Sequence, residues 1–148
     1  MDKITREAQE HGEVFEKLTF FKKFVSVLPS GSVTDWIRNF REFLEGDVVD
    51  HFRFEEDELF PAVLAIGTDE EKKFIQDLQQ EHDRVLDKIG QFKDLSSKCG
   101  SDPDEKQINE LVSLSSQIIE MVTKHAHKED NELFPLFKKY HFDLEQNN

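Results

Sequence analysis

The chain has 148 residues, a single cysteine and a formal net charge of −13 at pH 7. That length predicts one domain over residues 1–148. The negative charge argues against a nucleic-acid partner, which needs a basic patch, and against an anionic membrane surface. One thiol excludes an internal disulfide, no apolar run reaches the roughly 18 residues of a membrane span, and no signal peptide opens the chain. We therefore expect a cytoplasmic protein.

Apolar residues recur with the 3.6-residue period of an amphipathic helix throughout the sequence, and no alternating strand pattern interrupts them. The pattern predicts helices at about residues 2–28, 33–60, 69–98 and 103–134, followed by a polar tail over 138–148. Such helices joined by short loops form an up-down-up-down antiparallel four-helix bundle. The expected fold class is therefore all-α.

Capping signals mark where the last two helices begin. Thr68 and Glu71 have the spacing of a capping box at the start of the third helix. For the fourth helix we expect Asp102 as the N-cap, Pro103 at the first helical position and Glu105 completing a second box.

One stretch of the sequence occurs twice. Residues 51–61, His-Phe-Arg-Phe-Glu-Glu-Asp-Glu-Leu-Phe-Pro, return as residues 125–135, His-Ala-His-Lys-Glu-Asp-Asn-Glu-Leu-Phe-Pro. Both copies place a glutamate four residues after a histidine, so an imidazole and a carboxylate share one face of a helix. Each copy ends in a proline, Pro61 or Pro135, which should kink or stop its helix because it cannot donate a backbone hydrogen bond.

Four of the chain's 6 histidines fall on the apolar stripes, one in each predicted helix: His11, His51, His82 and His125. At ~1.5 Å per residue, all four lie roughly 14–20 Å from the same end of the bundle. Glu55 and Glu129 belong to the same predicted layer. Burying these groups without partners would cost several kcal/mol for each carboxylate. We therefore expect this layer to bind metal.

Two divalent ions would balance such a layer, because the carboxylates can bridge the ions and neutral imidazoles can complete each side. A mixture of imidazole and carboxylate without thiolate suits iron, manganese or zinc. Glu58 and Glu132 lie one turn further along the same faces, as alternative ligands, as partners of the imidazoles, or as a polar exit toward the end of the bundle. We expect Glu56, Asp57 and Glu81 to be solvated.

These motifs, in their order along the chain, resemble the hemerythrin-like, or HHE cation-binding, family. The resemblance covers the chain from Glu10-His11, through His51-x-x-x-Glu55 and Glu81-His82, to His125-x-x-x-Glu129 and Pro135. It implies two iron ions held by the four histidines, with Glu55, Glu129 and an oxo or hydroxo group as bridges. One iron would stay open for a small ligand.

The oxygen-carrying members have a fifth histidine, four residues from another on the third helix. Here Leu78 and Leu86 stand four residues either side of His82, so that histidine is missing. The oxygen carriers also place an aspartate five residues after the last histidine, which makes Asp130 an alternative to Glu129. The ligand set is most similar to that of the di-iron proteins that repair iron–sulfur centres.

The resemblance implies a non-haem di-iron protein that binds O₂ or NO for sensing, storage or redox protection. An alternative is an iron-handling or repair enzyme that donates iron to iron–sulfur centres or reduces NO or peroxide. A metal-free interaction module is a third hypothesis, against which the buried polar layer argues. The expected partner is a small molecule, and a binding protein is favoured over an established enzyme.

Overall fold

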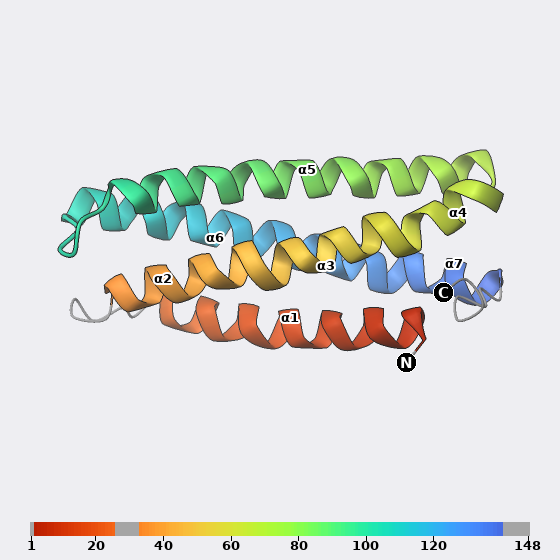
Figure 1. Cartoon of the computed structure of the whole chain (residues 1–148), viewed down its shortest axis with the longest axis horizontal. Helices are drawn as coiled ribbons and strands as arrows, with labels where there is room; N and C mark the ends of the chain where they lie inside the picture. The colour runs from red at the N-terminus through yellow and green to blue at the C-terminus, as the bar shows by residue number, and fades with distance from the viewer. Residues whose placement is uncertain (1, 26–32, 141–148) are drawn as a thin grey trace.

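The computed structural model describes residues 2–25 and 33–140, which form four helical rods running in alternating directions (Figure 1). The helical segments, in chain order, are α1 (Lys3–Val25), α2 (Val33–Phe43), η2 (Leu44–Val48), α3 (Val49–Phe54), η3 (Glu55–Leu59), α4 (Phe60–Ile66), α5 (Asp69–Lys98), α6 (Glu105–Lys128), η4 (Glu129–Leu133) and α7 (Phe134–Lys139). The first rod is α1, the second runs from α2 to α4, the third is α5, and the fourth runs from α6 to α7. This arrangement confirms the all-α up-down-up-down bundle. The expected end of the first helix near residue 28 lies outside the described residues.

Each copy of the repeated stretch contains a wide helical turn that the sequence did not predict. The turns η3 and η4 begin at Glu55 and Glu129, whose carbonyls accept the backbone N–H five residues further on, from Phe60 and Phe134. The proline that follows stands in the first turn of α4 or α7, where a missing donor costs little. The prolines therefore do not stop the helices, which continue to Ile66 and Lys139.

The third rod begins as predicted, and the fourth does not. The Thr68 hydroxyl accepts from the Glu71 backbone, and the Glu71 carboxylate accepts from the Thr68 backbone. In α6 the N-cap is Asp104 with Gln107 as its reciprocal partner, so the expected cap at Asp102 is wrong. Two overlapping boxes fit this stretch of sequence. The box that forms pairs the Asp104 carboxylate with the neutral Gln107 amide, whereas the expected box would place two carboxylates of like charge together.

Two apolar clusters fill the bundle. The larger contains Phe21, Phe40 and Phe92, and the smaller contains Phe60 and Phe137. Along each rod the buried histidines and glutamates fall between residues of the two clusters. A polar layer therefore divides the core. Within the described residues, none of the helices has the length and hydropathy to cross a membrane.

Replacing Thr68 with Ala should lower the free energy of unfolding by about 1 kcal/mol, because the N3 backbone donor of α5 loses its acceptor. Urea denaturation followed by circular dichroism measures the change. Thr19→Ala is the matched control, since Thr19 is exposed inside α1 and its hydroxyl only returns to the Phe15 carbonyl. Equal losses in the two variants would contradict a capping role.

Candidate metal centre

The polar layer brings side chains from all four rods into two overlapping groups that could hold metal. The first group contains Glu7, His11, His51, Glu55 and Glu129, and the second contains Glu55, His82, His125 and Glu129. Within each group the candidate ligand atoms lie within 4.8 Å of one another. We call the places these groups surround the first position and the second position. Glu55 and Glu129 belong to both, as bridging ligands would.

All six residues expected from the sequence lie in this layer, and none is more than 5% exposed. The further candidates do not join either group. Glu58 and Glu132 are exposed, and Glu58 pairs with Lys3 at 2.8 Å. Asp130 lies outside the layer and contacts the outer nitrogen of His11. The structure therefore places Glu129, rather than Asp130, among the inner groups.

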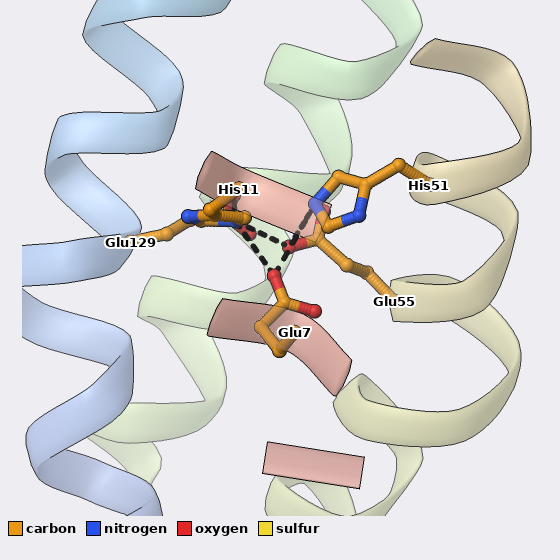
Figure 2. Close-up of side chains that lie close together, drawn as sticks. All are labelled: Glu7, His11, His51, Glu55 and Glu129. Atoms are coloured by element: carbon orange, nitrogen blue, oxygen red, sulfur yellow. Dashed lines mark ion pairs between the residues drawn. The ribbon is translucent and has the colours of Figure 1, made fainter. Parts of the chain in front are cut away.

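Glu7 is a member of the layer that the sequence patterns did not reveal. Its side chain is fully buried, and its Oε1 lies 2.7 Å from His11 Nε2 and 3.3 Å from His51 Nε2. Figure 2 shows Glu7 and Glu55 converging with these imidazoles. Glu7 stands four residues before His11, so both share one face of α1. This four-residue spacing is the one sequence feature that indicates Glu7, although here the carboxylate precedes the histidine, whereas in the repeated stretch it follows.

The inner polar atoms of the layer fit a pair of divalent cations. The imidazole nitrogens and carboxylate oxygens that face one another are 2.7–3.9 Å apart. Many of these buried atoms nevertheless have no hydrogen-bond partner, among them Nε2 of all four histidines and both carboxylate oxygens of Glu7 and Glu55. Each such atom costs about 1–3 kcal/mol when left unpaired, against ~5–15 kcal/mol of stability for a whole domain. Imidazole nitrogens and carboxylate oxygens aimed into one space are a donor set for iron, manganese or zinc.

The outer nitrogens of the same imidazoles are held by a ring of carboxylates. The Nδ1 contacts are His51 to Glu10 at 2.9 Å, His82 to Glu56 at 3.0 Å, His125 to Glu81 at 2.9 Å and His11 to Asp130 at 2.8 Å. Each rod thus supports the histidine of the next rod, and the fourth supports the first. A carboxylate on Nδ1–H fixes the tautomer and turns Nε2 toward a metal.

The expectation that Glu56 and Glu81 are solvated is therefore wrong, whereas Asp57 is exposed as expected. Each of these two carboxylates directly adjoins an inner residue in the sequence, Glu55 or His82. That position lies on the flank of its helix, where the side chain covers the seam with the next rod. Periodicity alone does not distinguish such a flank from a solvated face.

Burial lowers the pKa values of the histidines, and neighbouring carboxylates raise them. Burial lowers the pKa of His125, but contacts with carboxylates led by Glu129 outweigh it and raise the pKa to about 11. The same balance raises the pKa of His11 and of His51. At His82 burial prevails and the pKa is lowered. Metal-free protein therefore holds protons on several imidazoles, which a bound metal must displace.

The inner carboxylates have divergent pKa values. Burial raises the pKa of Glu7, yet contacts with Glu55, His11 and His51 outweigh it and bring the pKa to about 2. Burial, followed by repulsion from Glu129 and Glu7, raises the pKa of Glu55 well above its usual value. Closely placed carboxylates do not all ionise together, which leaves Glu55 as the proton-bearing member.

A family model described as the hemerythrin HHE cation binding domain matches residues 2–137. That range contains both copies of the repeated stretch and every residue of the polar layer. Comparison with curated proteins and with solved structures yields no match.

Replacing Glu56 with Gln should weaken metal binding about 10- to 100-fold, because His82 loses the charged partner that orients its ring. Metal titration with a competing chelator measures the affinity. Asp57→Asn is the control, as it removes the same charge from the exposed neighbouring position. An equal loss in both variants would assign the effect to net charge instead of ring orientation.

The stability gained from metal should increase with pH. In the metal-free protein the pKa of His125 is about 11 when folded and 6.5 unperturbed. The stabilisation from its proton is therefore complete below pH 6.5 and declines as pH rises toward 11. Metal requires neutral imidazole, so protons compete less at higher pH.

We expect the Tm difference between metal-loaded and metal-free protein to grow from about pH 6.5 to about 8.5. Thermal unfolding followed by circular dichroism measures both states. A difference that shrinks over this range would contradict the protonation states assigned to the layer.

Proposed function

The chain belongs to the hemerythrin HHE cation-binding domain family, and we propose that it is a non-haem di-iron protein that binds O₂ or NO. Its role would be sensing, storage or redox protection. The observation that carries the proposal is the pair of buried donor groups sharing Glu55 and Glu129. His11, His51 and Glu7 would hold one iron, and His82 and His125 the other. When bound, ferrous iron supplies a redox-active centre with affinity for these diatomic molecules.

The surroundings of the layer favour a small uncharged ligand. A small cavity of about 10 Å³ adjoins the rings of His11, His51 and His125, and its volume is close to the minimum space for a single water molecule. Its other lining residues are Val14, Val48, Phe52, Val122, Ala126 and Glu129. Apart from the three imidazoles and the Glu129 carboxylate, these lining residues are apolar, which disfavours a large polar substrate. This setting supports O₂ or NO over a charged substrate.

An iron-handling or repair enzyme is the second candidate, and the outer carboxylate ring favours it. The four ring carboxylates are 24–38% exposed, and each also contacts an imidazole of the layer. They therefore connect the buried site with the surface by groups that attract cations. A protein that donates iron to iron–sulfur centres needs such an exit, whereas a binder of diatomic gases does not.

Anaerobic titration of the ferrous protein with NO, followed by absorbance and electron paramagnetic resonance, tests the proposal. We expect saturable binding of about one NO per metal pair, since protein groups fill most ligand places. His125→Ala should abolish it, while the control His127→Ala should not, because His127 is exposed and outside both groups.

Failure of the di-iron protein to bind NO or O₂ would contradict the proposal. Transfer of iron to an apo iron–sulfur protein, without stable ligand binding, would favour the second candidate.

A further inference from the structure

The helices α1 and α5 place different side chains at corresponding points of the metal layer. Both helices run in the same direction in the bundle (Figure 1), and each contributes one histidine, His11 or His82. Four residues before that histidine stands Glu7 on α1 and Leu78 on α5, and both side chains are fully buried. The same helical turn therefore presents a carboxylate to the first position and an aliphatic group at the second.

This difference makes the two positions unequal in protein ligands. The first position has five candidate ligand residues and the second has four, with Glu55 and Glu129 counted in both. Glu7 accounts for the difference: its Oε1 contacts the inner nitrogens of both His11 and His51. For metals of equal coordination number, the second position keeps one more place for an external ligand.

Aromatic and aliphatic side chains also pack against the second position. The ring of Phe52 stacks on His82 with centroids 3.9 Å apart, and Phe60 also stacks on it with centroids 5.4 Å apart. Phe60 and Leu78 belong to the same apolar cluster. Within the described residues, no further histidine, cysteine, aspartate or glutamate takes the place of Glu7 in the second group. A free ligand place among these groups suits an uncharged diatomic molecule better than water or an anion.

We propose that the external ligand binds at the second position, between His82 and His125, and that the Glu7–Leu78 pair selects this position. Glu7 fills the corresponding place at the first position, and Leu78 leaves it free at the second. The inference rests on the proposed di-iron function and adds which metal takes the ligand and which residues determine the choice.

Exchanging the two side chains tests this selection, with NO as the probe ligand and iron content measured on the same samples. Leu78→Glu should still bind two irons and should lose NO binding at least about tenfold, because the new carboxylate fills the free place. The double variant Glu7→Leu with Leu78→Glu should bind two irons and regain about one NO per pair, because the free place moves to the first position. Ile75→Glu, another fully buried apolar position on α5, controls for a buried charge alone.

Unchanged NO binding in a Leu78→Glu protein that holds two irons would overturn the inference. If that variant does not fold, Glu7→Gln decides instead. It should weaken the binding of one iron about tenfold or more, because removal of a proposed ligand should cost at least as much as removal of a ligand-orienting partner. It should also raise NO toward two per fully loaded pair. Unaltered iron affinity and NO stoichiometry in Glu7→Gln would equally overturn it. Wild-type protein that failed to take up two irons would refute the proposed function itself, a separate outcome.

Discussion

The structure depends on one constraint: four imidazoles and three carboxylates meet in the middle of an apolar bundle with their inner atoms unpaired. Apolar packing on either side of this layer does not satisfy those atoms. Protons shared among Glu7, Glu55 and the histidines satisfy the layer in part, which explains the divergent pKa values of its members. Cations satisfy it more fully, because each attracts several of these atoms at once. The bundle is therefore a scaffold that metal binding would complete.

The ring of outer carboxylates explains how separate helices hold the imidazoles in place. Each rod supplies at least one inner residue of the layer, and it also supplies the carboxylate that orients the next rod's histidine. Rotation of one rod would disturb two imidazoles, its own and its neighbour's. The ring also fixes which ring nitrogen faces inward, so the site is organised before a metal enters.

The sequence predicts six candidate ligands, which lie in the repeated stretch or on the apolar faces of the helices. It can do so because residues four apart share a helix face and because the His-x-x-x-Glu pattern occurs twice. The sequence does not predict Glu7, because its spacing to the histidine occurs on α1 and is not repeated on α5, where the corresponding residue is Leu78. Glu56 and Glu81 were misassigned because the burial of a helix flank depends on the neighbouring rod. The wide turns at Glu55 and Glu129 likewise depend on backbone hydrogen bonds that side-chain periodicity does not encode.

Iron content per chain, measured after anaerobic ferrous loading and removal of excess metal, decides whether the polar layer holds two iron ions. Elemental mass spectrometry against protein concentration gives the ratio. We expect a value close to two, which should fall when Glu55, a member of both groups, is replaced by Ala. A ratio near zero in the folded wild-type protein would contradict it.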